Sequence, residues 1–477
     1  MRSAAKPITG IFVNDDFARG HQLRDRARFA SPKRQEKVPV VIVGGGVSGL
    51  CAGWRLQKRG MKDFVLLEME ARAGGNSRSG QNEVSAFPWG AHYVPVPSRK
   101  NTLVREIFED FGLVRDGVWD ERNLCFSPQE RLFVNGRWQE EIEPAYDPDQ
   151  FQRFGARMKE LRATGEFTIP VAETAHTKTV GMDGMSMAEW MQREKFTSPY
   201  LNWYIDYACR DDYGSLARDT SAWAGAHYFC SRDPEEKGPL TWPEGNGWLV
   251  KQLLARVPVR TGEMVHRIVR EGKRWKVASA DVEYVTDAVI FAAPTFLAPY
   301  VIDPAPPILH REYSPWLTAN LTMDRLPKED DSELAWDNVI YDSPALGYVV
   351  ATHQTLATHI ERSVWTFYWS LAEMQPKTAR QLLLDKDWTF WKEAILNDLS
   401  KAHPDIRDCV SRIDIMRFGH AMARPVPGFL TTRQPSTEGL YFANSDQSGY
   451  SIFEEAQYRG VRAADDSLLH LHGRVSR

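Results

Sequence analysis

The sequence predicts an α/β fold built on a parallel sheet, and three observations in its N-terminal part support this prediction. Val40 to Val43 form an uninterrupted apolar run, which is typical of a strand buried on both faces of a parallel sheet. Glycines follow at 44–46, and apolar residues then recur at helical spacing until about Gly60. A second apolar run, Phe64 to Leu67, ends at Glu68. Together these residues predict a strand–helix–strand unit.

Later segments continue the alternation of strands and helices. Strands are predicted at 265–269 and 275–277, and a buried strand within 284–293 is stopped by Pro294. A last strand at 440–443 is followed by a polar turn and a helix from about Ser451. The stretches 115–240 and 311–410 are rich in Trp and Tyr and show no such pattern.

Composition excludes several classes of protein. The 477 residues carry 59 Lys and Arg against 63 Asp and Glu, and this near balance argues against a nucleic-acid binder. The five cysteines are far apart and form no C-x-x-C pair, so we expect neither a disulfide framework nor a metal site.

No apolar stretch approaches the roughly 18–20 residues of a transmembrane helix, so we expect no membrane-spanning segment. Residues 1–37 lack the apolar segment of a secretion signal. We therefore expect a cytoplasmic protein, although an exported chain that had lost its signal would look the same.

The glycines of the predicted unit form a dinucleotide-binding fingerprint. Gly44, Gly46 and Gly49 give the pattern G-x-G-x-x-G between a buried strand and a helix. The first glycine permits a tight turn, the second lets the backbone approach a pyrophosphate, and the third lets helix and strand pack closely. Glu68 ends the second strand, where a carboxylate accepts hydrogen bonds from ribose hydroxyls. The sequence therefore predicts a Rossmann-type nucleotide site.

The residues after Glu68 resemble those of the FAD-dependent amine oxidase superfamily, which includes monoamine and polyamine oxidases, L-amino acid oxidases and protoporphyrinogen oxidases. That family continues with four or five residues and then Gly-Gly-Arg, and here Gly74, Gly75 and Asn76 follow. Further segments resemble family motifs at 89–93, 242–247, 264–265, 287–294 and 439–464.

The resemblance implies a Rossmann-type FAD-binding domain of the glutathione-reductase kind, with a discontinuous α+β substrate-binding domain. We expect an N-terminal arm at 1–37 and an FAD-binding domain formed by 38–114, 241–310 and 411–477. Residues 115–240 and 311–410 would form the substrate-binding domain.

The resemblance also implies the cofactor and its contacts. No cysteine follows Cys409, so the cysteinyl attachment of some relatives is absent and we expect non-covalent FAD. Arg72 or Arg78 is expected to replace the family's arginine as a phosphate ligand, unless both are merely exposed. Asp446 is expected at the ribityl chain, unless it only caps a helix. The expected cofactor-binding residues are Gly44, Gly46, Gly49, Glu68, Arg72, Gly75, Asn76, Gly90, Ala91, His92, Val265 and Asp446.

One departure concerns the reaction with dioxygen. Many amine-oxidising relatives hold a lysine near flavin N5 and use it in reoxidation, in the strand that corresponds to 315–323. No lysine occurs between Lys276 and Lys328. Dehydrogenase chemistry therefore stays open beside oxidase chemistry.

Four residues are candidates for catalysis. Tyr450 and Phe453 flank the start of the closing helix, where the family places rings facing the flavin, although core packing is the alternative for each. His420 precedes the closing motif by about the family's spacing for a ring-facing residue, although a structural hydrogen bond is the alternative. Asp212, beside Asp211, is expected to attract a cationic amine. Pairing with Arg210 or Arg218 is the alternative for these two carboxylates.

The leading hypothesis is an FAD-dependent oxidoreductase that moves a hydride from a C–N bond of an amine or amino acid to flavin N5, giving an imine. The alternatives are a flavin-dependent C–C dehydrogenase, desaturase or isomerase, and a non-catalytic flavoprotein. The expected partner is a small amine-like substrate, while the electron acceptor and the oligomeric state stay open.

Overall fold

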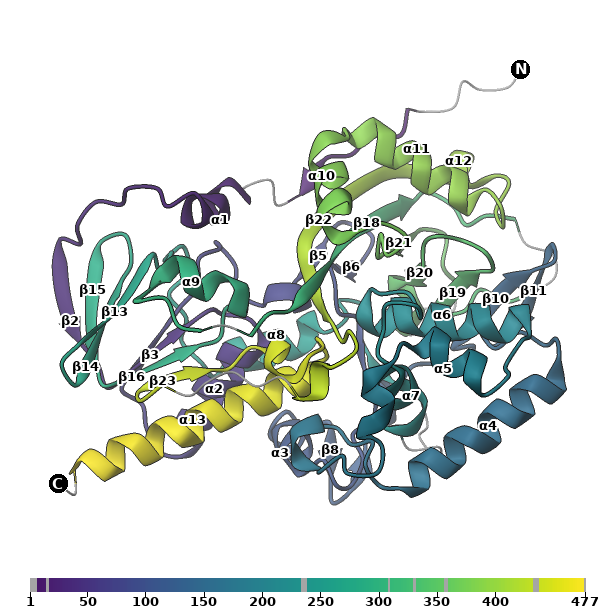
Figure 1. Cartoon of the computed structure of the whole chain (residues 1–477). Coiled ribbons are helices and arrows are strands. Elements are labelled where there is room, and N and C mark those ends of the chain that lie inside the picture. Colours follow the sequence, from purple (N-terminus) through teal and green to yellow (C-terminus); the bar gives the residue numbers. More distant parts are fainter. Residues whose placement is uncertain are drawn as a thin grey trace.

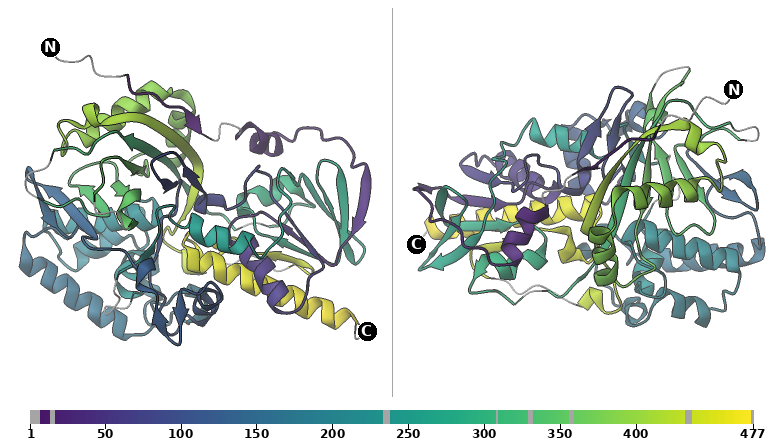
Figure 2. Two further views of the ribbon diagram at one scale, coloured as in Figure 1. Left: turned by 180° about the vertical axis from the view of Figure 1, so that it is seen from behind. Right: turned by 90° about the horizontal axis from the view of Figure 1, so that it is seen from above.

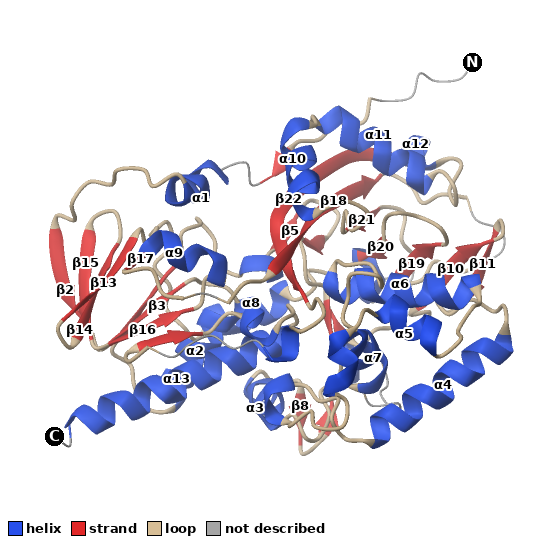
Figure 3. Cartoon of the chain, viewed as in Figure 1, coloured by secondary structure: helices blue, strands red, loops and turns tan. Residues whose placement is uncertain are grey.

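The computed structural model describes residues 7–13, 17–232, 238–307, 309–328, 332–355, 359–431 and 437–475. These residues form two lobes that lie side by side (Figure 1). One lobe contains a four-stranded parallel sheet and a five-stranded sheet, and the other is built on an eight-stranded sheet. The predicted α/β class is confirmed (Figure 3).

The four-stranded sheet contains the predicted strand–helix–strand unit. β3 (Val40–Val43) and β4 (Phe64–Leu67) are parallel neighbours, and α2 (Val47–Lys58) connects them. β16 (Ala288–Phe291) pairs with the other edge of β3, and β23 (Leu440–Phe442) pairs with β16, both in parallel. Three distant segments of the chain thus end at one edge of the same sheet.

The apolar stretch at 284–293 spans two strands rather than the single strand predicted. β15 (Val282–Thr286) alternates buried with half-buried residues, whereas β16 is buried throughout. Alternation suits a strand with one covered face, and a continuous apolar run suits a strand covered on both. The chain accordingly changes sheets at Asp287.

Both faces of the parallel sheet are covered. Helices pack on one face, where Ile42, Leu66 and Ile290 join their core. The five-stranded sheet packs on the other face, against Val41 and Val289. Its strands, in spatial order, are β17 (Ile302–Asp303), β13 (Arg267–Glu271), β14 (Arg274–Ala278), β15 and β2 (Arg34–Lys37). The helices of this lobe are α1 (Phe17–Arg24), α2, α3 (Thr102–Asp110), α8 (Gly247–Leu254), α9 (Ala298–Val301) and α13 (Phe453–Val475).

The second lobe is a large mixed sheet with helices on both faces. In spatial order its strands are β1 (Phe12–Val13), β22 (Val410–Arg424), β18 (Glu312–Met323), β21 (Ser363–Trp369), β20 (Gly347–Val350), β19 (Asp337–Ile340), β10 (Glu130–Val134) and β11 (Arg137–Glu140). α10 (Pro376–Asp385), α11 (Trp388–Leu399) and α12 (Ile406–Cys409) share a core with one face. Tyr207 of α6 (Pro199–Tyr213) packs on the other face, against Trp316 and Tyr368.

The remaining elements surround this lobe and its junction with the first. They are α4 (Pro148–Ala163), α5 (Met187–Arg193), α7 (Ala222–Cys230) and the strand pairs β7 (Tyr93–Val94) with β12 (Leu240–Thr241), β5 (Ser79–Gln81) with β6 (Ala86–Pro88), and β8 (Val114–Arg115) with β9 (Val118–Trp119). Within the described ranges, no helix is both long enough and apolar enough to cross a membrane.

The N-terminal segment contributes strands to both lobes. β1 pairs in parallel with β22, and β2 pairs in parallel with β15. α1 lies between them along the surface (Figure 2). Residues 1–6 and 14–16 of the predicted arm lie outside the described residues.

Strand pairing bears on one boundary of the predicted domains. We expected 411–477 to belong to the FAD-binding domain, but β22 pairs with β18 of the eight-stranded sheet. We therefore propose that the return to the first lobe lies after Arg424.

The contact of α13 with α2 depends on a glycine. A Cβ on Gly460 would lie 2.1 Å from the carbonyl oxygen of Ser48 and 3.1 Å from the backbone nitrogen of Ala52. The two helix backbones therefore touch here, and no larger residue fits without a shift.

We expect Gly460→Ala to lower the free energy of unfolding by roughly 1–3 kcal/mol, because overpacking forces the two helices apart. Gly473→Ala is the matched control in the same helix, since a Cβ there meets nothing within 4 Å. The control should be neutral or stabilising by up to about 1 kcal/mol. Thermal and denaturant unfolding measure both, and a Gly460→Ala protein as stable as the control would contradict this account of the helix contact.

Candidate active site

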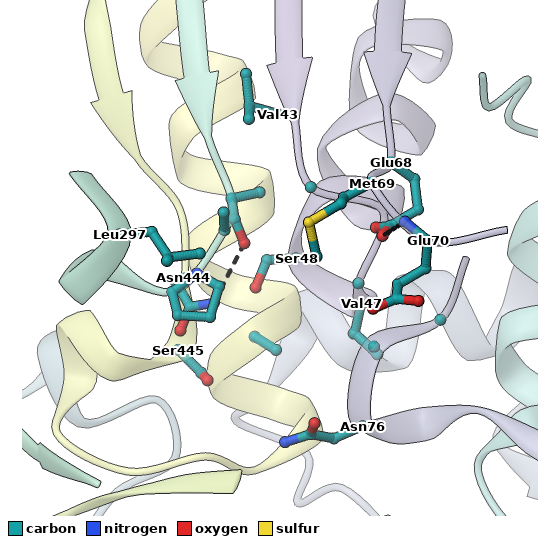
Figure 4. A pocket seen from close by; sticks show the side chains of 18 of the residues that line it. Val43, Val47, Ser48, Glu68, Met69, Glu70, Asn76, Leu297, Asn444 and Ser445 are labelled. Carbon is teal, nitrogen blue, oxygen red and sulfur yellow. Dashed lines mark hydrogen bonds between the residues drawn. The ribbon is translucent and has the colours of Figure 1, made fainter. Parts of the chain in front are cut away.

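A groove of about 350 Å³ lies at the edge of the parallel sheet where the strands end. Residues from β3, β4 and β16 and from the segments that follow them line it, together with the first residues of α2 and α13 (Figure 4). Leu23 of α1 and Val301 of α9 close one end with apolar surface.

Backbone atoms of the glycine turn form part of the groove surface. Gly44 has φ of +106°, a conformation that L side chains rarely adopt. A Cβ on Gly49 would lie 1.9 Å from the carbonyl oxygen of Gly44, so the turn and the helix are in contact. A Cβ on Gly46, in contrast, would have Gly75 Cα, 3.9 Å away, as its nearest atom. The second glycine therefore keeps space open, while the first and third permit the turn and the close packing.

α2 presents its N-terminus to this space. Gly46 is the N-cap and supplies no side chain to the first N–H groups of the helix. Val47 and Ser48 line the groove beside it. Unpaired N–H groups and the positive end of a helix are suited to a pyrophosphate.

Glu68 lies across the turn. One of its carboxylate oxygens accepts a 2.7 Å hydrogen bond from the Gly45 N–H, and the other accepts a 2.8 Å bond from the Glu70 N–H. Each carboxylate oxygen can accept a second hydrogen bond. The carboxylate is thus fixed at the groove wall and keeps acceptor capacity for hydroxyl groups.

The segment after β4 carries the next predicted residues. Arg72, Gly75 and Asn76 line the groove, and so does Arg78, whose Nε donates to the Gly75 carbonyl at 3.1 Å. Asn76 Nδ2 donates to the carbonyl of Ala421 on β22 at 2.5 Å. Where the family has an arginine, this asparagine joins the two lobes.

The opposite wall comes from the middle and the end of the chain. Val265 is 6% exposed and lines the groove as predicted, with Met264 beside it. Asn444 and Ser445 line the groove after β23, and Asn444 Nδ2 donates to the carbonyl of Ala292 at 3.2 Å.

Asp446 is not among the residues that line the groove, so we no longer place it at a ribityl chain. Its side chain is 1% exposed and accepts hydrogen bonds from the Thr295 N–H, the Thr295 hydroxyl and the Tyr313 hydroxyl at 2.6–2.7 Å. The carboxylate is therefore used to join β18 to the segment after β16.

The substitution at Glu455 likewise has a structural role. In α13, where the family has a glycine, its buried carboxylate accepts hydrogen bonds from the Val171 N–H at 2.7 Å and the Ser448 hydroxyl at 2.5 Å. It points away from the groove and ties the helix start to the second lobe.

A second cavity, of about 160 Å³, adjoins the groove. The two cavities share Asn76, Ala91, Phe418, Ala421, Ser451, Ile452 and Phe453 as walls. The shared walls come from both lobes, so the second cavity meets the groove where they join.

Acids and aromatic rings line the second cavity. The acids are Asp211, Asp212, Asp337 and Glu454, and the rings include those of Tyr93, Tyr207, Trp316, Tyr368 and Tyr450. Arg232 is the one lysine or arginine among the described lining residues, and its Nη2 lies 3.2 Å from Asp212 Oδ1. The carboxyls therefore outnumber the cation.

Burial shifts the pKa values of these acids and of the neighbouring imidazoles toward their neutral forms. It raises the pKa of Glu454 to about 7 and, with the neighbouring Asp212, raises the pKa of Asp211 to about 7. Burial lowers the pKa of His92 and of His227 to about 4, so both imidazoles are neutral at pH 7.

The structure brings three of the four predicted catalytic residues to the second cavity. Asp212, Tyr450 and Phe453 line it, and Phe453 also lines the groove. The Tyr450 hydroxyl lies 3.2 Å from His227 Nε2. His420 instead lines the groove and not the second cavity. Its side chain is exposed, and its ring stacks on Phe296 with 4.4 Å between the ring centres. We therefore no longer place His420 beside the substrate.

Two expected contacts of the cofactor also lie in the second cavity. Gly90 and His92 line it rather than the groove, while Ala91 lines both. A Cβ on Gly90 would lie 2.3 Å from the Asn76 carbonyl oxygen, so this glycine permits the chain segments to meet. The ring of His92 stacks on Tyr368 at 4.7 Å.

Several polar residues of the second cavity were not among the predicted site residues, and they include Arg232, Asn246, Asp337 and Glu454. Arg232 pairs with Asp212, in place of the expected Arg210 or Arg218. Arg210 instead contacts Asp206 and donates to the backbone at 343–345. Two of these cavity residues had a signal in the sequence: Glu454 lies in the first turn of the predicted closing helix, and Asn246 lies in the segment 242–247 that resembles a family motif.

The groove fits FAD on its own geometry. The uncapped N-terminus of α2 faces the open space at Gly46, the carboxylate of Glu68 is fixed beside it, and none of the five cysteines lines the groove. The first residues of α13 reach the junction of the two cavities, where a helix N-terminus stabilises negative charge.

We expect Gly46→Val to give a folded protein with weakened affinity for FAD, because its Cβ enters the groove at ordinary contact distance from the protein, 3.9 Å from Gly75 Cα. The loss should be roughly 100-fold, since each hydrogen bond to a charged group contributes about 1.5–3 kcal/mol. Fluorescence titration of apoprotein with FAD measures this loss, and circular dichroism checks the fold. Gly155→Ala in α4, where a Cβ meets nothing within 4 Å, is the control. Unchanged affinity in Gly46→Val would place the phosphates elsewhere.

Curated relatives match short parts of the chain. An L-amino-acid oxidase from Vipera ammodytes ammodytes is 34% identical over 108 residues, 22% of this chain and 21% of that protein. A peroxisomal N(1)-acetyl-spermine/spermidine oxidase from Bos taurus is 34% identical over 96 residues, 19% of each protein. A probable flavin-containing monoamine oxidase A from Dictyostelium discoideum is 23% identical over 172 residues, 36% of each. The matches therefore span between about a fifth and a third of these relatives.

Solved structures share the whole fold. A putrescine oxidase double mutant superposes with a TM-score of 0.71 at 16% identity, covering 91% of this chain and 100% of that one. Cyclohexylamine oxidase from Brevibacterium oxydans IH-35A gives 0.68 at 14% identity, covering 91% and 99%. A fatty acid isomerase from P. acnes gives 0.65 at 15% identity, covering 90% and 98%.

A family model decides the assignment. It describes the flavin-containing amine oxidoreductases and matches residues 47–468, from the first turn of α2 into the last helix. The family's cofactor is FAD. This chain belongs to the flavin-containing amine oxidoreductases.

Proposed function

We propose that this enzyme oxidises a C–N bond of a small amine that arrives as a cation. The observation that carries the proposal is the second cavity, which adjoins the groove and holds four carboxyl groups against one arginine. FAD, bound in a lobe of the glutathione-reductase-like Rossmann type, supplies a hydride acceptor at N5, and the oxidised amine leaves as an imine that water hydrolyses.

The charges favour an amine over an amino acid. A substrate carboxylate needs a cation, and Arg232 is already paired with Asp212 at 3.2 Å and within 3.4 Å of the Tyr93 hydroxyl. The remaining carboxyls, Asp211, Asp337 and Glu454, offer a substrate carboxylate no cationic partner. A cationic amine, in contrast, is attracted to the carboxylates and balances their negative charge.

The aromatic walls suit the same substrate. His92 and Tyr368 stack at 4.7 Å, and Tyr93 packs edge-on to Trp336 at 5.9 Å. The Tyr368 hydroxyl donates to the Gly90 carbonyl at 2.9 Å, so this ring is fixed at the junction. Rings exclude water from the reacting carbon, and their faces attract an ammonium group.

The same cavity argues against chemistry at carbon–carbon bonds. The fatty acid isomerase shares the fold, so the fold alone permits that alternative. A long apolar substrate would desolvate the carboxyls of Asp211 and Asp337 without supplying hydrogen bonds, which is costly. The putrescine and cyclohexylamine oxidases, whose names describe amine substrates, agree better with these walls.

We expect anaerobic mixing with small primary amines and diamines to bleach the flavin. Bleaching by amino acids should be at least about tenfold slower, because burying a substrate carboxylate without a free cation costs more than about 1.4 kcal/mol. Stopped-flow absorbance across amines, amino acids, porphyrinogens and fatty acids measures the order. Bleaching by porphyrinogens or fatty acids alone would contradict the proposal.

We also expect slow reoxidation of the reduced enzyme in air. Trp316 and Thr318 are the residues of β18 that line the cavity, and no lysine lies on this strand. The family resemblance assigns a lysine here a role in the reaction with dioxygen. Oxygen consumption and the return of flavin absorbance measure the rate, with an artificial electron acceptor as comparison. Rapid peroxide formation would show that the lysine is dispensable.

A further inference from the structure

Asp211 and Asp212 are adjacent in α6 but have different partners. Asp212 accepts from Arg232, whose guanidinium also lies 4.5 Å from the centre of the Tyr228 ring and donates to the Tyr93 hydroxyl at 3.4 Å. The more distant charge of Arg232 and a hydrogen bond with the Tyr93 side chain oppose the rise that burial causes in the pKa of Asp211, which forms no ion pair with any of the described residues. Arg232 therefore balances the charge of Asp212 directly, whereas the Asp211 carboxylate is stabilised by the hydrogen bond with the Tyr93 hydroxyl and only at longer range by Arg232.

Charged and titratable groups from several elements face Asp211. They are Asp212 and Tyr207 of α6, Tyr93 of β7, Tyr228 of α7, Arg232, Glu130 of β10, Asp337 of β19 and Tyr368 of β21. Arg232 is the single cation among them. Burial together with Asp211 raises the pKa of Asp337 well above its ordinary value. The pKa of Asp211 is raised to about 7, by burial first and by Asp212 second.

An unpaired acceptor faces the same space. Asn246 lines the cavity, is 1% exposed, and its Oδ1 has no hydrogen-bond partner among the described residues. Its Nδ2 donates to the Tyr93 carbonyl at 3.1 Å, so Tyr93 connects Asn246 to Asp211. A buried acceptor without a donor points to a ligand that carries N–H groups.

We propose that Asp211 accepts the proton that the substrate ammonium must lose before its C–N bond is oxidised. The inference rests on the proposed function. An N–H bond of R–NH₃⁺ breaks, an O–H bond forms on the Asp211 carboxylate, and the nitrogen keeps the electron pair. The net charge of the site does not change, and an ion pair becomes two neutral groups.

Burial makes this transfer favourable. Two charges taken out of water lose hydration that their attraction repays only in part, whereas neutral groups lose less. Hydrogen bonds remain available to both products, because the Tyr93 hydroxyl contacts Asp211 and Asn246 Oδ1 accepts from an amine. Arg232 pairs with Asp212 at 3.2 Å and opposes the rise that burial causes in the pKa of Asp212. Asp211 has no such ion pair among the described residues, so we assign the proton to Asp211.

The test measures binding of tert-butylamine to the oxidised holoenzyme between pH 6 and 9.5, by calorimetry. The carbon that bears its nitrogen has no hydrogen, so binding is read without oxidation. Failure of the proposed function, with no amine bleaching the flavin, is thereby separate from failure of this inference.

For the native enzyme, we expect the Kd to fall about tenfold per pH unit below the pKa of Asp211, because binding then releases a proton to the buffer. Above that pKa the Kd should be constant, because the proton moves to the carboxylate. In Asp211→Asn the fall should continue up to the pKa of the amine, and Asp211→Glu should restore the plateau. A plateau that persists in Asp211→Asn, or loss of binding by this variant even at high pH, would overturn the proposal.

Three further variants sharpen the test. Asp206→Asn is the control, because Asp206 is a half-buried acid of α6 that does not line the cavity, and its profile should match the native one. Tyr93→Phe removes a hydrogen bond that favours the charged carboxylate, so the start of the plateau should move to higher pH. An unmoved plateau would count against the proposal. Glu454→Gln should keep the plateau, and its loss there would assign the proton to Glu454.

Discussion

Close contact between backbones at two glycines is the constraint on which the site depends. Gly49 lets α2 touch the turn at Gly44, and Gly460 lets α13 touch α2 at Ser48. Because both contacts lie near the ends of parallel strands, the N-terminus of α2 faces the groove and the start of α13 reaches its junction with the second cavity. Neither helix N-terminus could approach the same ligand if side chains separated these backbones.

One long strand of the second lobe, β22, supplies part of the wall between the groove and the proposed substrate cavity. β22 begins beside α12, and residues near its far end, Phe418 and Ala421, reach the wall shared by both cavities. Asn76 donates to the Ala421 carbonyl at 2.5 Å, and Glu455 accepts from the Val171 N–H at 2.7 Å. Both residues depart from the family pattern, and both join the lobes. The departures therefore fix the junction where cofactor and substrate meet.

The sequence predicted what depends on local pattern. The bounds of β3 and β4 follow from apolar runs of four residues, and the roles of Gly44, Gly46 and Gly49 follow from their spacing. It failed where distant segments provide the partners. Asp446 lies in a polar turn, but Thr295 and Tyr313 cover it, and Arg232 reaches Asp212 from beyond α7. No periodicity encodes such contacts, because they arise only when the lobes pack together.

The charge excess of the second cavity is best understood together with its burial. Four ionised carboxyls around one arginine would be unstable in a space with little water. The structure resolves this by protonation, since Asp337 has a pKa far above the ordinary value while Asp211 and Glu454 have values near 7. Close to neutral pH the cavity therefore carries little net charge. A bound cation can displace a proton from a protonated carboxyl, or donate a proton to an ionised carboxylate. Affinity for a cationic amine and readiness to take its proton are then two consequences of the same buried carboxyl groups.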